Sequence, residues 1–217
     1  MITVIAPKWV PPLVQGLVRD LRVRWALEEA GLPYQTRLIS RDEQTAPAYR
    51  ELQPFGQVPV YEEDGVRLFE TGAIVLHIAD RAPSLGPRDA DARTRMIMWM
   101  FAALNSVEPR LQALTEIDLF AAGQAWAEQR RPAVLETARG RLQGLAASLG
   151  EREYLDGPFS AADLLMTTVL RIPRHCELVA SFPALDAYRQ RCEARPAFQA
   201  ALASQMDEYA QNAPPQT

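Results

Sequence analysis

Cysteine is scarce in this chain of 217 residues: only Cys176 and Cys192 occur, and they do not form a C-x-x-C pair. This scarcity excludes a cysteine-rich metal cluster and a disulfide framework, so we predict no metal and a reducing, cytoplasmic environment. The longest apolar run, residues 96–104, is far shorter than the roughly 20 residues that span a membrane. The N-terminal residues also lack the pattern of a secretory signal.

Clusters of basic residues are absent as well. The formal net charge is −4, and Lys8 is the single lysine, whereas a protein that binds nucleic acid usually carries a basic patch. We therefore expect neither nucleic acid nor a membrane as a partner. With 48% hydrophobic and 23% charged residues, the chain can bury a core in one large domain or two smaller ones.

The pattern of the first 82 residues predicts a mixed sheet with helices between its strands. Gly31 and Pro33 end the first helix, because glycine favours the left-handed conformation and proline cannot continue a helix. The Asp64-Gly65 turn predicts a hairpin between the last two strands. The predicted order is β-α-β-α-β-β-α, with strands at residues 2–6, 34–39, 58–61 and 66–69 and helices from 14, at 46–52 and at 71–81.

A stretch rich in proline, serine and glycine then predicts a linker. Beyond it, the apolar residues have helical spacing, and no segment convincingly predicts a strand. Pro109 and Pro132 are expected to end or kink helices. Helices are expected at residues 93–115, 124–149, 160–171, 183–194 and 196–208. We therefore predict a first domain at residues 1–82, a linker at 83–89, an all-helical bundle at 90–209 and a flexible tail at 210–217.

The Val58-Pro59 step stands at the start of a predicted strand. If its peptide bond is cis, the N–H and C=O of Val58 turn outward and are free to pair with an extended peptide. The alternative is a trans proline that merely begins a strand at a sheet edge.

The Glu70-Thr71 pair stands at the start of a predicted helix. The N–H groups and the positive dipole end of a helix bind a carboxylate, and the Glu70 carboxylate offers a counter-charge for an amine. Together they suit the head group of an amino acid. The alternative is that Thr71 simply caps the helix.

Further motifs surround these two features: residues 53–59 (QPFGQVP), 70–74 (ETGAI), 79–80 (AD), 154–157 (YLDG), 160–163 (SAAD), 182–185 (FPAL) and 195–198 (RPAF). This set, which spans nearly the whole chain, resembles the cytosolic, bacterial-type glutathione S-transferase family. The resemblance implies an α/β thioredoxin-like N-terminal domain followed by an all-α helical-bundle domain that shapes an apolar pocket. It also implies a cytoplasmic homodimer that joins glutathione to a small hydrophobic electrophile in detoxification.

The resemblance assigns roles by position. Val58 would pair through its backbone with the cysteinyl part of glutathione, ahead of cis-Pro59. Glu70 and Thr71 would hold the amine and carboxylate of the γ-glutamyl part, and Gln57 would assist from the side. Glutathione is thus the expected co-substrate.

The chain departs from the family where the thiol of glutathione is activated. The family usually has a Tyr, Ser or Cys near the start of the first helix, but none of these occurs before Tyr34. The catalytic residue is therefore unknown. Weak candidates for a donor to the thiolate are the Trp9 indole and the Gln15 amide, with Lys8 and the backbone N–H groups of residues 14–17 as further possibilities.

A second departure concerns the glycine end of glutathione, where the family often has His and Lys. This chain has Gln44 and Thr45 there, and Arg41 or Gln44 would have to compensate. One alternative function is a non-catalytic module that binds glutathione or another protein. Others are a glutathione-dependent isomerase, dehalogenase or peroxidase.

The neighbours His175 and Cys176 suggest a nucleophile and its base. We expect them to be structural instead, because adjacent residues on a helix do not face each other and nothing orients the histidine. His77 is expected to be packed. A disulfide oxidoreductase is disfavoured, since no cysteine lies in the first 175 residues.

Overall fold

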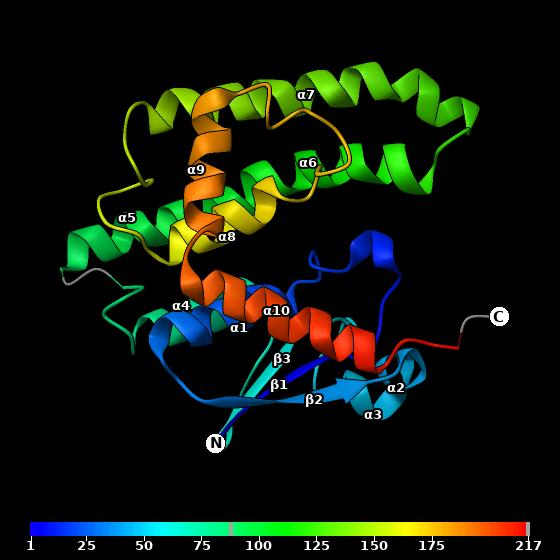
Figure 1. Cartoon of the computed structure of the whole chain (residues 1–217), viewed down its shortest axis with the longest axis vertical. Coiled ribbons are helices and arrows are strands. Elements are labelled where there is room, and N and C mark those ends of the chain that lie inside the picture. Colours follow the sequence, from blue (N-terminus) through cyan, green and yellow to red (C-terminus); the bar gives the residue numbers. More distant parts are fainter. Residues whose placement is uncertain (87–88, 216–217) are drawn as a thin grey trace. The chain divides into compact units, whose positions relative to one another are not determined.

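The structure is a computed structural model of the whole chain, of which residues 1–86 and 89–215 are described. Backbone contacts divide it into two compact units: Met1–Gly86 together with the chain from Arg195 onward, and the chain between them (Figure 1). The domain limits drawn from the sequence stay predictions. Two residues of the expected linker, 87 and 88, and two of the expected tail, 216 and 217, lie outside the described residues.

The first unit contains a four-stranded mixed sheet with the order β2-β1-β3-β4. β1 lies parallel to β2 and antiparallel to β3, and β3 forms a hairpin with β4. Val4 and Ile5 of the central strand β1 are fully buried, as expected for a strand covered on both faces. The predicted mixed sheet is confirmed, with strands at β1 (Ile2–Pro7), β2 (Tyr34–Ile39), β3 (Val60–Glu63) and β4 (Val66–Leu68).

The helices of this unit are α1 (Asp20–Ala30), α2 (Arg41–Thr45), α3 (Pro47–Arg50), α4 (Thr71–Ala79) and α10 (Pro196–Gln211). The prediction that the first helix starts at Val14 is wrong. A short 3-10 turn, Pro12–Val14, comes first, and Gly16 then has a positive φ of 74°, which right-handed helices exclude. The apolar spacing therefore continues through a loop, and α1 begins only at Asp20.

The C-terminal helix α10 packs on α1 in the first unit (Figure 1). The buried rings of Trp25 and Phe198 meet edge to face, with centroids 4.8 Å apart, a favoured geometry for aromatic pairs. Arg195 donates two hydrogen bonds to the Glu29 carboxylate, at 2.6 and 2.8 Å. These contacts hold the end of the chain against the helix that precedes β2.

A buried cluster of charged side chains also lies between α1 and α10. The Arg24 guanidinium, 1% exposed, donates to Asp20 Oδ2 at 2.8 Å and to Glu208 Oε2 at 2.5 Å. Burial raises the pKa of Asp20, against the influence of Arg24. The Thr36 hydroxyl donates to the second oxygen of Glu208 at 2.6 Å. Arg24 thus joins α1 to α10, and Glu208 joins α10 to β2.

The second unit is helical, and none of its described residues forms a strand. The prediction of one helix over residues 93–115 needs correction, because two π-helical segments, Ala102–Val107 and Glu116–Phe120, flank α6. Pro132 lies inside α7, which continues past it. α6 packs against α7. The helices are α5 (Ala90–Phe101), α6 (Glu108–Thr115), α7 (Ala125–Leu149), α8 (Ala161–Leu170) and α9 (Pro183–Glu193).

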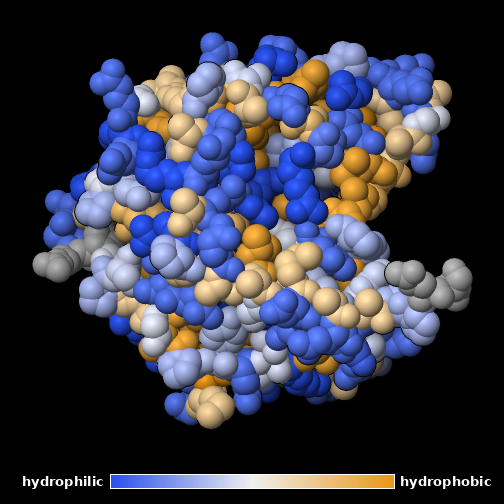
Figure 2. Space-filling view, in the orientation of Figure 1, coloured by the Kyte–Doolittle hydropathy of each residue, from blue (hydrophilic) through white to orange (hydrophobic). Residues whose placement is uncertain are grey.

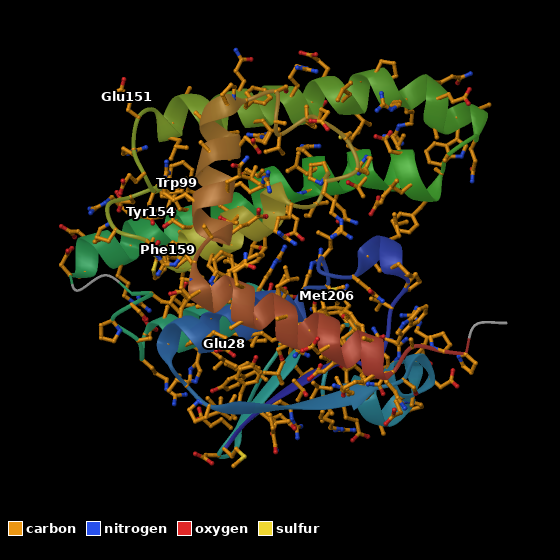
Figure 3. All side chains as sticks on the ribbon, in the orientation of Figure 1. Glu28, Trp99, Glu151, Tyr154, Phe159 and Met206 are labelled. Atoms are coloured by element: carbon orange, nitrogen blue, oxygen red, sulfur yellow. The ribbon has the colours of Figure 1, made fainter. Side chains whose placement is uncertain are left out.

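The first turn of α8 contains a buried carboxylate. Asp163, which is fully buried, accepts hydrogen bonds from Leu155 N, Ser160 N and the Tyr188 hydroxyl at 2.8–2.9 Å. Nearby, the rings of Tyr154 and Phe159 (Figure 3) meet edge to face at 5.6 Å. The YLDG and SAAD motifs therefore have a structural role. Among the described helices, none combines the length and apolar character needed to cross a membrane.

Candidate functional site

The Val58–Pro59 peptide bond is cis, as the family resemblance implied. Val58 packs its side chain against the buried cluster of Ile5, Ile39, Tyr49 and Val60. Within residues 1–86 and 89–215, no hydrogen bond uses the N–H or C=O of Val58, and β3 begins two residues later. Val58 therefore offers one donor and one acceptor to an extended peptide, which is how an added strand binds to a sheet edge.

The loop before Val58 is fixed by Gln53 and Tyr49, whose contacts could not be predicted from the sequence. The Gln53 side chain, 2% exposed, accepts hydrogen bonds from Phe55 N at 2.7 Å and Gln57 N at 3.1 Å. The Tyr49 hydroxyl donates to Gln57 O at 2.7 Å, and burial raises the pKa of Tyr49 to about 12. The backbone of Gln57 is thus held in place, while its side chain is exposed.

The first turn of α4 is open to a ligand. Thr71 is the first residue of this helix, and no side chain caps it. Within the described residues, the N–H groups of Thr71, Gly72 and Ala73 have no acceptor, although the start of a helix attracts anions. Glu70 is exposed and has a positive φ of 68°. Its carboxylate therefore lies beside an anion-binding turn.

A buried arginine stands behind this turn. Arg22, 4% exposed, donates from Nη1 to Thr71 Oγ1 at 3.2 Å. The Thr71 hydroxyl therefore acts as an acceptor toward Arg22, which leaves its own proton for another acceptor. The alternative, in which Thr71 simply caps the helix, is wrong. The hydroxyl oxygen of Thr71 accepts a hydrogen bond from Arg22 and none from a backbone N–H of the helix. The role of Arg22 could not be predicted from the sequence, since it depends on a residue 49 positions away.

The segment Lys8–Leu17 contains the candidate donors to a thiolate. Its backbone N–H groups at residues 14, 15 and 17 donate to carbonyls within the segment. The Gln15 amide donates to Val10 O at 2.9 Å. Trp9 is half-buried, and its indole N–H has no hydrogen-bond partner in the described part of the chain. Of the two side chains predicted as weak candidates, the Trp9 indole thus has the uncommitted donor.

Of the two residues expected at the glycine end, Gln44 has a structural contact. Its amide nitrogen donates to Gly56 O at 2.8 Å, which braces the same loop that Gln53 fixes. Arg41 is exposed and donates a long hydrogen bond of 3.4 Å to the Gln44 carbonyl oxygen. Most of the Arg41 guanidinium is therefore available to a carboxylate.

The two histidines differ. His77 packs edge to face on Tyr61 with ring centroids 5.5 Å apart, as expected. In the second unit, the expectation that nothing orients His175 is wrong, because its Nε2 lies 3.0 Å from Asp118 Oδ2. Asp118 is 57 positions away in the sequence, so no local pattern could have revealed the pair.

Comparison with known proteins places these features in a family. A model of the N-terminal domain of glutathione S-transferases matches residues 21–81. Glutathione S-transferase 4 of Zea mays is 31% identical over 188 residues, which cover 81% of this chain and 83% of that protein. The match to glutathione S-transferase 3 of Schizosaccharomyces pombe is 33% identical but covers only 46% of this chain and 43% of that protein.

Among solved structures, a glutathione transferase from Burkholderia graminis superimposes with a TM-score of 0.80 at 27% identity. The alignment covers 94% of this chain and 88% of that one, which holds two glutathione molecules per subunit. These similarities confirm the predicted fold class, a thioredoxin-like domain with a helical-bundle domain.

Proposed function

The chain belongs to the glutathione S-transferase family, and we propose that it binds glutathione and promotes attack of the glutathione thiolate on a small apolar electrophile. A role in detoxification follows from this reaction class. The proposal rests on two features that occur together. The N–H and C=O of Val58 have no partner within the described residues and suit an extended peptide, and the uncapped first turn of α4 at Thr71 suits a carboxylate.

Each part of glutathione has a partner in this proposal. The cysteinyl N–H and C=O pair with the backbone of Val58. The γ-glutamyl carboxylate accepts from the Thr71 hydroxyl and the first turn of α4, and its amine faces the Glu70 carboxylate. Gln57 assists with its exposed amide, and Arg41 takes the glycine carboxylate, with Gln44 supporting the loop.

Activation of the thiol needs one strong donor. Lowering a thiol pKa from about 8.5 to about 6.5 corresponds to roughly 2.7 kcal/mol of preference for the thiolate. A hydrogen bond to a charged group contributes about 1.5–3 kcal/mol, so the Trp9 indole with modest help from the backbone would suffice. We propose Trp9 for this role because its N–H is uncommitted within the described residues.

A second candidate is a glutathione-binding module without catalysis. It is favoured by the absence of Tyr, Ser and Cys before Tyr34 and by the internal hydrogen bonds of the backbone N–H groups near Gln15. A glutathione-dependent isomerase, dehalogenase or peroxidase would keep the same binding site and differ in the second substrate.

We further propose a cytoplasmic homodimer. Hydrophobic residues lie among hydrophilic ones on the face shown in Figure 2, and the large apolar side chains that are exposed include Phe55 (64%), Met98 (54%) and Phe101 (61%). A second copy of the chain would cover them. Light scattering should give twice the mass of the chain, and Phe55→Ser should lower it. A monomeric wild-type protein would contradict the dimer.

The test of function combines calorimetric titration of glutathione with the ultraviolet absorbance of its thiolate. Binding together with thiolate formation at neutral pH supports the transferase, and binding of the thiol form alone supports the non-catalytic module. The variant Trp9→Phe keeps the ring but removes the donor, so thiolate formation should fall while binding is retained. Absence of binding at millimolar glutathione would refute both functions.

A further inference from the structure

Three side chains of the second unit lie close together. Asp118, His175 and Cys176 each bring one potential ligand atom into a group in which all three atoms lie within 4.8 Å of one another. Asp118 and His175 have side chains only 10% and 15% exposed, and Cys176 is half-buried. The group is therefore close to the surface but mostly shielded from water.

The geometry of the group distinguishes a common centre from a catalytic relay. In a Cys–His–Asp relay the thiol and the carboxylate contact opposite nitrogens of the ring, which puts them roughly 7 Å apart. Here the sulfur and a carboxylate oxygen are within 4.8 Å of each other. The Cys176 thiol also points its hydrogen bond at Pro173 O, at 3.4 Å, instead of at the imidazole. A nucleophile activated by His175 does not fit this arrangement.

A metal ion does fit it. Around tetrahedral Zn²⁺, nitrogen, oxygen and sulfur ligands are about 3.3–3.7 Å apart, and His175 Nε2 already lies 3.0 Å from Asp118 Oδ2. Nδ1 of the same ring is buried and has no hydrogen-bond partner within the described residues. The ring proton can stand on Nδ1, which leaves the Nε2 lone pair for a metal ion. Small side-chain rotations would bring the three ligand atoms around one ion.

The surroundings fix the carboxylate in place. Arg131 donates to Asp118 Oδ1 at 2.7 Å and to Oδ2 at 3.1 Å. An ion bound through Oδ2 would replace the second contact and keep the first, so that Arg131 orients the ligand from behind. Asp118 lies in the π-helical segment Glu116–Phe120, a local structure that often marks functional sites.

We propose that Asp118, His175 and Cys176 form a binding site for Zn²⁺ or a similar divalent transition metal ion. Carboxylate, imidazole and thiolate are all ligands that Zn²⁺ accepts, and three protein ligands leave a fourth position for water or another small ligand. The prediction of no metal was based on the lack of cysteine clusters. That lack does not exclude a metal site that contains a single cysteine. This site is independent of the proposed transferase activity.

The test is a titration of the untagged, metal-stripped full chain with Co²⁺, which gives an ultraviolet charge-transfer band when a thiolate binds it. The chain provides matched controls because it has only two cysteines and two histidines. Binding of one equivalent with a thiolate band is expected for the wild type, for Cys192→Ala and for His77→Asn. Cys176→Ala should abolish the band, and His175→Asn should weaken Zn²⁺ competition at least about tenfold.

Several results would overturn the site. The site is ruled out if the wild-type protein binds no Co²⁺ at micromolar concentration, or if it binds Co²⁺ without a thiolate band. A band that persists in Cys176→Ala would place the thiolate elsewhere. Circular dichroism of each variant checks that the helices are intact, and the wild-type titration is decisive even if one variant does not fold.

Discussion

The hydroxyl of Thr71 provides the most direct test of the glutathione site. Its oxygen accepts from Arg22 Nη1 at 3.2 Å, and its proton is therefore free for the γ-glutamyl carboxylate. Thr71→Val keeps the shape of the side chain but removes this donor. A hydrogen bond to a charged group contributes about 1.5–3 kcal/mol, so the dissociation constant of glutathione should rise about 10- to 150-fold.

The same substitution also leaves the buried Arg22 without this acceptor. Loss of a partner for a buried polar group costs about 1–3 kcal/mol, so Thr71→Val should lower the free energy of unfolding in urea as well. Thr71→Ser keeps the hydroxyl and is the matched control. It should bind glutathione within a few-fold of the wild type and unfold at nearly the same urea concentration.

Calorimetric titration with two ligands separates a local effect from a general one. Cysteinylglycine lacks the γ-glutamyl part, so its weaker binding should be the same in the wild type and in Thr71→Val. Wild-type affinity of Thr71→Val for glutathione would refute the role of this hydroxyl. An equal loss of affinity for cysteinylglycine and glutathione would refute it as well, because the valine would then disturb the whole site.

Three further predictions concern stability and titration. Arg24→Leu should lower the free energy of unfolding by about 3–5 kcal/mol, because it removes the ion-pair partner of the buried Asp20 carboxylate. Arg95→Leu, at a half-exposed ion pair, should cost at most about 1 kcal/mol, and equal effects of the two substitutions in urea would contradict this. Hydrogen bonds from Arg81 and Tyr61 lower the pKa of Glu63, so this group stabilises the fold above its unfolded pKa of about 4.5 and the stability is lost as the pH falls below it. Glu63→Gln should therefore reduce the fall in the free energy of unfolding at acid pH. An unchanged pH dependence would contradict a stabilising contact between Glu63 and Arg81. Spectrophotometric titration of the folded protein should show fewer than six tyrosines ionising near pH 10, while the unfolded chain shows all six, because burial raises the pKa of Tyr34, Tyr49, Tyr61, Tyr188 and Tyr209.

The sequence predicted those parts of the fold whose signals are local. The alternation in residues 34–39 and the Asp64-Gly65 turn lie within a few residues of the structure that they form, and both predictions are confirmed. The start of the first helix was missed for a physical reason. The apolar spacing continues from Val14, but the positive φ of Gly16 interrupts the helical conformation, and spacing alone does not report a backbone angle.

The candidate site also contains residues with local signals in the sequence and residues whose role depends on the fold. Val58 and Thr71 could be identified because each belongs to a short motif with a recognisable chemistry. Arg22 and Gln53 could not, because they act on other residues through the fold. A buried arginine within a predicted helix looks like any other charged residue until α4 places Thr71 against it. Likewise, Asp118 and His175 meet only in the folded second unit.

Arg22 also connects the two halves of the proposed mechanism. It lies on α1, which begins three residues after the segment Lys8–Leu17 that carries Trp9. Its hydrogen bond to Thr71 fixes α1 against the turn that would hold the γ-glutamyl end of glutathione. A ligand that fills this turn would therefore stabilise the position of α1 and of the loop that leads into it. Specificity for the γ-glutamyl group and placement of the thiolate donor would then depend on the same buried contact, because a shift of α1 would change both.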